Sequence, residues 1–247
     1  MSYLINNKNQ KISYKSIKGK GLGIIFIHGL NSDMNGLKAK SIAKYAQKNN
    51  LSFICFDCRG HGKSFGKFED FTISDWKEDL INIIDNVSTG PQILIGSSMG
   101  GWLMTLAAKA RPKRIVGLIG LAAAIDFGNN LYNHLTKKNK TEIKKNGITK
   151  YSSYGFSYFL KYKFFIDAKK NNILTKPFKY KKPLILIHGL KDDVVNDSIP
   201  KKIMNITSGD NVQIIYLKSS DHRLSKLQDL ITINKAIDDI RNQIQLS

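Results

Sequence analysis

The sequence predicts an α/β fold, with a mostly parallel sheet and helices on both of its faces. Short runs rich in Ile, Leu, Val and Phe alternate with longer segments whose apolar residues recur at helical spacing. The short runs are apolar throughout, which is typical of strands buried on both faces. In such a sheet, reactive side chains gather at the carboxyl ends of the strands.

The expected elements follow one another in regular order. Strands are expected in residues 23–29, 51–57, 91–96, 114–122, 182–189 and 211–218. Helices are expected in residues 36–49, 72–87, 98–111 and 225–244. Thr72 can cap the second helix because Asp75 lies three residues further on, and Pro112 follows the third helix.

Residues from about 126 to 180 interrupt this alternation, because they lie between two core strands and carry no strand pattern. They resemble short helices, and an insertion of this length over the strand ends would form a lid; a long ordinary crossover is the alternative. We therefore expect residues 1–247 to form a single domain with this lid insertion. Aromatic residues of the lid either wall an acyl channel or form a small core of its own: Tyr154, Phe156, Tyr158, Phe159, Tyr162, Phe164 and Phe165.

Composition argues against several classes of protein. Hydrophobic residues make up 42% and charged residues 23%, as in ordinary globular domains, and no apolar run reaches the roughly 18 residues of a membrane span. The net charge is +20, but the lysines are scattered and far outnumber the arginines. AT-rich codon usage therefore explains the charge better than nucleic-acid binding does. The polar N-terminal segment lacks the apolar centre of a secretory signal, so we expect a soluble, cytoplasmic protein.

The two cysteines, Cys55 and Cys58, have C-x-x-C spacing but do not indicate a metal site. Zinc would need two further ligands at similar spacing, and the sequence offers none. Cys55 also lies within an apolar run, where a small hydrophobic residue fits. We expect neither a metal nor an organic cofactor.

The stretch Gly96-Ser97-Ser98-Met99-Gly100 follows an expected strand and precedes an expected helix. It fits the pattern G-x-S-x-G with Ser98 at its centre, where a sharp turn exposes a nucleophilic serine. Ser97 cannot take that place because its flanking residues would be Ile95 and Met99. The backbone N–H groups of Met99 and of Leu30, in the loop after the first expected strand, are the expected oxyanion donors.

A serine needs a base to take its proton, and the chain order of this pattern is Ser, then Asp, then His. Of the histidines after Ser98, His222 follows the last expected strand, where a base can reach the strand ends; His134 and His188 remain alternatives. The acid is expected after the preceding strand, at Asp192 or Asp193. The turn around Asp57, Arg59 and His61 is interpreted as structural.

Together, "FIHGL", "FDCRGHGKS", "GSSMGGWL", "HGLKDDVV" and "SSDHR" resemble the α/β-hydrolase superfamily over nearly the whole chain. The stretches "MNG" and "SSMGGWLM" are similar to the mitochondrial palmitoyl-protein thioesterases of the abhydrolase group, also described as acyl-glucuronide esterases. This resemblance implies the α/β-hydrolase fold and a triad of Ser98, Asp192 and His222. Asn196 stands where the family often has proline, and the family's mitochondrial leader is missing, which suggests a bacterial-type relative.

The sequence thus predicts a serine hydrolase that cleaves esters or thioesters through an acyl-enzyme. The resemblance implies an acylated (palmitoylated) protein as substrate; a generic small-molecule carboxylesterase is the alternative. The lysines are compatible with an anionic leaving group. A non-catalytic binding protein of the same fold is a different class, whose hallmark would be the loss of a triad position. The sequence indicates no nucleic-acid partner and no membrane span, and it sets no oligomeric state.

Overall fold

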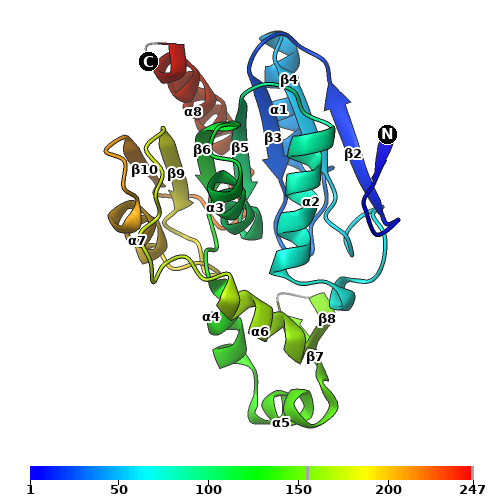
Figure 1. The fold of residues 1–247 in the computed structure, drawn as a ribbon. Helices are drawn as coiled ribbons and strands as arrows, with labels where there is room; N and C mark the ends of the chain where they lie inside the picture. Colours follow the sequence, from blue (N-terminus) through cyan, green and yellow to red (C-terminus); the bar gives the residue numbers. More distant parts are fainter. Residues whose placement is uncertain (154–155, 246–247) are drawn as a thin grey trace.

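Within residues 1–153 and 156–245, which the computed structural model describes, eight strands form one sheet at the centre of the molecule (Figure 1). They are β1 (Ser2–Ile5), β2 (Lys11–Ile17), β3 (Gly23–Ile27), β4 (Ser52–Phe56), β5 (Gln92–Ser97), β6 (Ile115–Leu121), β9 (Leu184–Gly189) and β10 (Val212–Leu217). Their order across the sheet is β1-β2-β4-β3-β5-β6-β9-β10. All strands from β4 to β10 in this order run parallel, whereas β2 is antiparallel to both of its neighbours.

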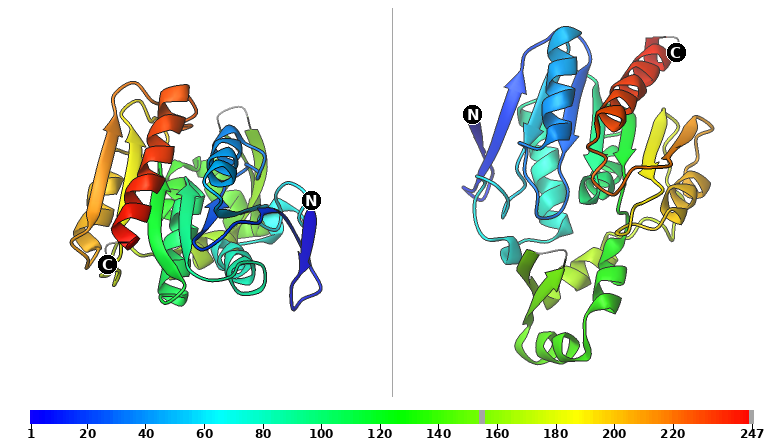
Figure 2. Two further views of the ribbon diagram at one scale, coloured as in Figure 1. Left: turned by 90° about the horizontal axis from the view of Figure 1, so that it is seen from above. Right: turned by 180° about the vertical axis from the view of Figure 1, so that it is seen from behind.

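Helices cover both faces of the sheet. They are α1 (Leu37–Lys48), α2 (Ile73–Asn86), α3 (Met99–Ala110), α7 (Ser198–Ile206) and α8 (Leu227–Gln245). Helices α2, α3 and α7 contribute to one apolar core, and α1 and α8 contribute to the other. Figure 1 and the rear view in Figure 2 show α1 and α8 behind the sheet and α2 and α3 in front. The predicted α/β architecture is confirmed.

Helix α2 begins where the sequence predicts. The Asp75 carboxylate accepts hydrogen bonds from both the backbone N–H and the hydroxyl of Thr72, at 3.0 and 2.9 Å. Apolar residues at helical spacing, including Trp76, Leu80 and Ile83, are completely buried against the sheet. The helix therefore forms from a local start signal and is stabilised by burial of one apolar face.

Strands β1 and β2 and helix α7 were not foreseen from the sequence. Strand β2 lies near the edge of the sheet, and of its residues only Ile12 and Ser13 are buried, so it forms no apolar run. The search for the continuous apolar runs of buried parallel strands therefore misses it. These strands extend the sheet at the side away from β10.

The segment between β6 and β9, residues 126–180, projects beyond the carboxyl ends of the strands (Figures 1 and 2), and we call it the insertion. It contains α4 (Phe127–His134), α5 (Lys137–Asn146), β7 (Ile148–Ser153), β8 (Phe156–Lys161) and α6 (Tyr162–Lys170). The expectation of helices alone is wrong, because β7 and β8 pair as an antiparallel hairpin. Only one face of this hairpin is covered, since Leu160 is buried whereas Phe159 is 46% exposed.

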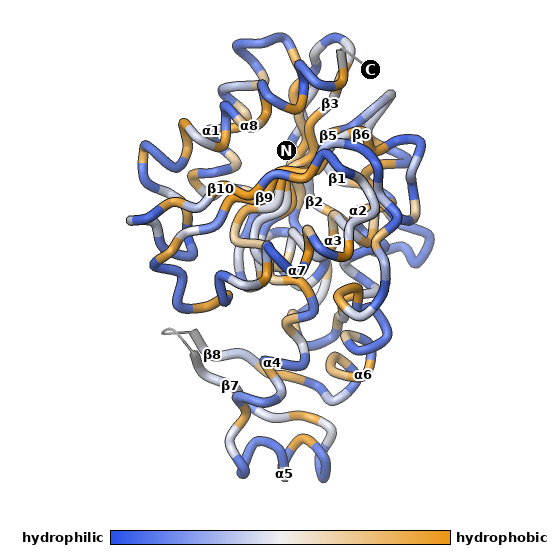
Figure 3. Tube along the Cα trace, turned by 90° about the vertical axis from the view of Figure 1, so that its left-hand side faces the viewer, coloured by the Kyte–Doolittle hydropathy of each residue, from blue (hydrophilic) through white to orange (hydrophobic). Residues whose placement is uncertain are grey.

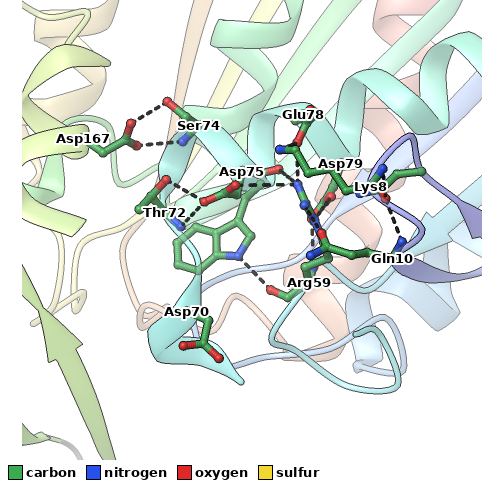
Figure 4. Close-up of polar contacts among 12 residues, drawn as sticks. Lys8, Gln10, Arg59, Asp70, Thr72, Ser74, Asp75, Glu78, Asp79 and Asp167 are labelled. Carbon is green, nitrogen blue, oxygen red and sulfur yellow. Dashed lines mark hydrogen bonds and ion pairs between the residues drawn. The ribbon is translucent and has the colours of Figure 1, made fainter. Parts of the chain in front are cut away.

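Two carboxylates fix the position of the insertion. Asp126, at its start, accepts hydrogen bonds from the N–H groups of Ile173 and Leu174 near its end, at 2.9 and 2.8 Å. Asp167 on α6 accepts from the N–H and hydroxyl of Ser74 in the first turn of α2, at 2.8 and 2.6 Å (Figure 4). Asp126 therefore joins the two ends of the insertion to each other, and Asp167 attaches the insertion to α2.

The aromatic side chains of the insertion divide into two groups. Phe164 and Phe165 are buried, and the ring of Phe164 lies 6.0 Å from that of Trp76 on α2. Phe159 and Tyr162 are exposed, and the Tyr158 ring packs edge-on against Phe68 of the 3-10 turn η1 (Phe68–Asp70) at 5.1 Å. Tyr154 and the side chain of Phe156 lie outside the described residues. Phe164 and Phe165 therefore join the insertion to the main core.

Hydropathy also separates the two parts of the molecule. Figure 3 shows β9 and β10 as largely apolar, whereas α5, at the far end of the insertion, is mostly hydrophilic. Among the described residues, none of the helices combines the length and the apolar character that crossing a membrane requires.

Candidate active site

Ser98 occupies a strained turn between β5 and α3. Its φ and ψ are 53° and −117°, a conformation that non-glycine residues rarely adopt. A Cβ on Gly96 would lie 2.2 Å from the carbonyl oxygen of Gly100, and one on Gly100 would lie 2.3 Å from that of Ile27. The two glycines thus allow β3, β5 and α3 to approach closely enough to hold the serine at the strand ends.

His222 and Asp192 lie beside this turn, although they are far away in sequence. The Ser98 hydroxyl donates to His222 Nε2 at 3.1 Å, and His222 Nδ1–H donates to Asp192 Oδ2 at 2.9 Å. Asp192 follows β9, and His222 follows β10, so parallel strands bring both loops to one edge of the sheet. The structure therefore brings together the three residues that the resemblance implies, in the order of a proton relay.

The Asp192 carboxylate is fully buried and held in a fixed position. Its Oδ1 accepts the N–H groups of Val194 and Val195 at 2.9 and 2.8 Å. Burial alone would raise the pKa of Asp192, but the hydrogen bonds from His222 and from these two N–H groups outweigh it and lower the pKa. Asp192 is therefore ionised at neutral pH and favours the tautomer of His222 whose Nε2 can accept a proton.

The neighbouring Asp193 is exposed, so it is Asp192 that faces the histidine. The side-chain oxygen of Asn196, where the resemblance implies a proline, accepts the Ser198 N–H at 2.9 Å. This contact helps to order the turn that leads into α7.

The loop that carries His222 is held from two sides. Lys38, in the first turn of α1, donates to the carbonyl oxygen of Arg223. The hydroxyl of Ser220 donates to the Asp229 carboxylate on α8 at 2.5 Å, and both residues are buried. These contacts limit the movement of the imidazole relative to Ser98. Sequence reasoning missed Lys38, because a contact between residues 185 positions apart has no local signal.

Two backbone N–H groups are placed to meet a charge that develops next to Ser98. Met99 is the first residue of α3, where N–H groups have no partner within the helix. Leu30 follows Gly29, at which a Cβ would lie 3.1 Å from the Cβ of Ser98. Among the hydrogen bonds of the described residues, neither the Leu30 nor the Met99 N–H has an acceptor. The arrangement is suited to an oxyanion, aided by the positive end of the α3 dipole.

The other histidines lie elsewhere. His134 is exposed in the insertion and contacts the Asn130 carbonyl. His188 is buried at the end of β9 with Nε2 facing the Val195 carbonyl at 3.1 Å, and burial lowers its pKa. His28 and His61 are buried with ring centroids 4.9 Å apart. Of the five histidines, His222 is the one that contacts Ser98 in the part of the chain that the structure describes.

Arg59 and Asp57 organise the loop after β4. The guanidinium of Arg59 is almost completely buried and bonds to Asp79 at 2.6 Å and to Glu78 at 2.8 Å (Figure 4). The Asp57 carboxylate accepts the N–H groups of Met34 and Lys63, at 2.8 and 3.0 Å. These contacts fit the structural interpretation of the turn. Cys55 and Cys58 are buried free thiols, and burial raises the pKa of Cys55 to about 11.

A family model described as serine aminopeptidase, S33, matches residues 21–151, more than half of the chain. The mitochondrial palmitoyl-protein thioesterase ABHD10 of Bos taurus is 38% identical over 248 residues, which cover 99% of this chain and 81% of the relative. The chain is an α/β-hydrolase. The solved structure of the mouse alpha/beta hydrolase domain-containing protein 10 superposes with a TM-score of 0.91 at 35% identity, covering 98% of both chains. A putative hydrolase from Agrobacterium vitis superposes with a TM-score of 0.90 at 26% identity, covering 97% of both chains.

These findings establish that this α/β-hydrolase is a serine hydrolase related to ester- and thioester-cleaving enzymes. They also correct one expectation. The thioesterase relatives from Bos taurus, Pongo abelii and Homo sapiens are all named as mitochondrial. The expected cytoplasmic location is therefore wrong; it relied on the polar character of the N-terminal segment, which does not determine where a protein resides.

Proposed function

We propose that the protein is an acyl-protein thioesterase that works through an acyl-enzyme on Ser98. His222 Nε2 takes the proton of the hydroxyl as Ser98 Oγ attacks the acyl carbon, and Asp192 stabilises the resulting imidazolium. The Leu30 and Met99 N–H groups hold the oxyanion of the tetrahedral intermediate. His222 then gives its proton to the leaving sulfur or oxygen, and a water molecule, activated by the same imidazole, releases the acid.

The observation that carries this proposal is the continuous pair of hydrogen bonds from Ser98 through His222 to Asp192 at the strained turn. An isolated serine hydroxyl is a poor nucleophile at neutral pH, and an imidazole in direct contact, acting as a base, removes that obstacle. The relatives from Bos taurus and Homo sapiens are named palmitoyl-protein thioesterases, which supports an S-acylated protein as substrate.

Labelling with a fluorophosphonate probe tests the nucleophile. Wild-type protein should be labelled, and Ser98→Ala should abolish both labelling and hydrolysis. Ser97→Ala is the matched control, because Ser97 is adjacent and buried at the end of β5 but does not contact His222. Labelling that survives in Ser98→Ala and disappears in Ser97→Ala would overturn the assignment.

The substrate class is tested with one acyl chain on different leaving groups. We expect a higher kcat/KM for an S-palmitoyl cysteine peptide than for p-nitrophenyl palmitate, compared after correction for the intrinsic reactivity of each substrate. A preference for p-nitrophenyl esters of short acids would instead identify a general carboxylesterase, with the same Ser98 chemistry.

A further inference from the structure

His188 takes no step in the proposed mechanism, yet it lies close to Asp192 of the candidate triad. It is the fifth residue of β9, and the four residues before it, 184–187, are all apolar and buried. The imidazole of His188 is completely buried as well. Burying a polar ring is unfavourable unless it forms hydrogen bonds, so the contacts of this ring indicate what it does.

Nε2 of His188 faces two oxygen acceptors in the turn that follows β9. It lies 3.1 Å from the carbonyl oxygen of Val195 and 3.6 Å from Oδ2 of Asp192. The same Oδ2 accepts the hydrogen bond from His222 Nδ1–H at 2.9 Å. Two imidazoles therefore approach one oxygen of the Asp192 carboxylate, with His222 in direct hydrogen-bond contact and His188 slightly further away.

The surroundings of His188 determine which of its nitrogens carries the proton. Burial lowers the pKa of His188, although the Asp192 carboxylate and the Val195 carbonyl oppose this effect, so the ring is neutral at physiological pH. A neutral imidazole has one N–H donor and one acceptor nitrogen. Because Nε2 faces two acceptors, Nε2 carries the proton and donates to the Val195 carbonyl, with the Asp192 carboxylate close to the same N–H.

This donor closes the turn that holds Asp192. Within the turn, Asp192 Oδ1 accepts the N–H groups of Val194 and Val195 at 2.9 and 2.8 Å. The carbonyl group of the same Val195 accepts the Nε2–H of His188 on β9. Both backbone polar groups of Val195 are therefore bound, which leaves the Asp192 carboxylate little freedom to turn Oδ2 away from His222.

The other nitrogen of His188 indicates that the ring is not retained for stability alone. Nδ1 is buried and has no hydrogen-bond partner among the described residues. An unpaired buried acceptor destabilises a fold. A leucine would avoid this penalty, as at Leu184 and Leu186 on the same face of β9. Natural proteins depart from such preferences at functional sites, and here the departure lies beside Asp192.

We propose that His188 is a positioning residue for the general base, acting through the turn that carries Asp192. Its Nε2–H holds the Val195 carbonyl and supports the charge of Asp192, so that Oδ2 stays directed at His222 while the proton is transferred. This inference rests on the proposed function, in which Asp192 orients His222. It requires His188 and Asp192 to be coupled in catalysis, which a residue that only stabilises the fold would not show.

Two variants test the donor at Nε2. His188→Leu removes it and should lower kcat about tenfold to 100-fold, the effect of a small displacement of a catalytic group, with KM within about twofold of wild type. His188→Gln places an amide N–H near the position of Nε2 and should restore kcat to within about fivefold of wild type. Both are assayed with one thioester substrate, at a temperature at which circular dichroism shows each variant to be folded.

Ile187→Ala is the matched control. Ile187 precedes His188 in β9 and is also buried, but its side chain belongs to the apolar core on the other face of the sheet. The substitution should destabilise the protein through the cavity that it leaves, and kcat should stay within about twofold of wild type. A fall in kcat as large as that in His188→Leu would show that any change in β9 disturbs the site, which would overturn the specific role of His188.

A double-mutant cycle tests whether His188 acts through Asp192. The rate constant for labelling of Ser98 by a fluorophosphonate is measured, because it stays measurable when turnover is slow. In the Asp192→Asn background, His188→Leu should change this rate constant by less than about twofold, since the carboxylate that His188 positions is already lost. An independent structural effect would lower the rate constant by the same factor in both backgrounds and would overturn the inference.

Two further results would overturn the inference: a folded His188→Leu that hydrolyses the substrate at the wild-type rate, or a His188→Gln that is as slow as His188→Leu. Ser98→Ala separates this inference from the proposed function. If labelling requires Ser98 but does not depend on His188, only the positioning role fails. If labelling and hydrolysis survive in Ser98→Ala, the proposed function itself fails.

Discussion

The sheet with its covering helices and the insertion are stabilised in different ways. The sheet is held by two apolar cores whose central residues are completely buried. The two ends of the insertion are joined by the Asp126 carboxylate, and the insertion is attached to the sheet region by the Asp167 carboxylate and a few aromatic contacts. Its outer helix α5 is hydrophilic. Ser98, Asp192 and His222 all come from the sheet region. Changes there should affect the chemical step, whereas changes in the insertion should affect local stability and access.

The largest effect is expected from Asp192→Asn. The amide cannot favour the reactive tautomer of His222 or stabilise its protonated form, so kcat should fall about 10⁴-fold. Stopped or continuous assays with a single thioester substrate measure kcat. Asp193→Asn is the control, because it makes the same change at the adjacent exposed residue. A loss of less than tenfold in Asp192→Asn, with normal folding, would contradict the role proposed for this carboxylate.

A smaller and more local effect is expected from Asp126→Ala. It leaves the N–H groups of Ile173 and Leu174 without their acceptor, which should cost about 2 kcal/mol. Hydrogen exchange should speed up in residues 127–172 more than in β5. If exchange accelerates equally in both regions, the insertion and the sheet unfold as one unit, and the distinction between them is wrong.

Acid should destabilise the sheet region through His61. Its pKa is about 3 when folded and near 6.5 when unfolded, so between these values the unfolded chain binds a proton that the folded chain excludes. Stability is therefore lost as the pH falls below about 6.5, by about 2 kcal/mol between pH 7 and pH 5. Urea unfolding of wild type and of His61→Phe at both pH values measures the loss of stability that is due to His61. The carboxylates titrate in both proteins, so their effects cancel in the comparison. An equal pH dependence in the two proteins would contradict it.

The smallest effect is expected from the ion pair between Lys161 of the insertion and Asp70, at 2.6 Å. Both side chains are partly exposed, so Lys161→Ala should change the free energy of unfolding by less than about 1 kcal/mol. Thermal unfolding at low and high salt measures it. A larger, salt-dependent loss would show that surface charge, rather than Asp167, attaches the insertion to the sheet region.

The sequence was most informative where one physical requirement controls a segment. Parallel strands must be apolar on both faces, so β3, β5, β6 and β9 were recognisable, and the glycines around Ser98 followed from the close approach of β5 and α3. The hairpin of β7 and β8 and the strands β1 and β2 at the edge of the sheet were missed, because none of them is a continuous apolar run: β1 is mostly exposed, and β2, β7 and β8 contain polar residues and lysines.

For the candidate site, too, local sequence patterns identified some residues and not others. Residue order and spacing favoured Ser98 and His222, but they left Asp192 and Asp193 equivalent until the family resemblance was considered. The geometry now places Asp192 against His222, while the catalytic roles themselves stay predictions until they are tested.

The carboxylate of Asp57 fixes a second loop as well as its own turn. By bonding to Met34 after β3 and to Lys63 after β4, it ties two loops into a single rigid frame. One of these loops carries the N–H of Leu30, and the other carries the imidazole of His61. A change that moves the turn after β4 should therefore also disturb the proposed oxyanion site, and divergence toward new substrates is easier through the insertion.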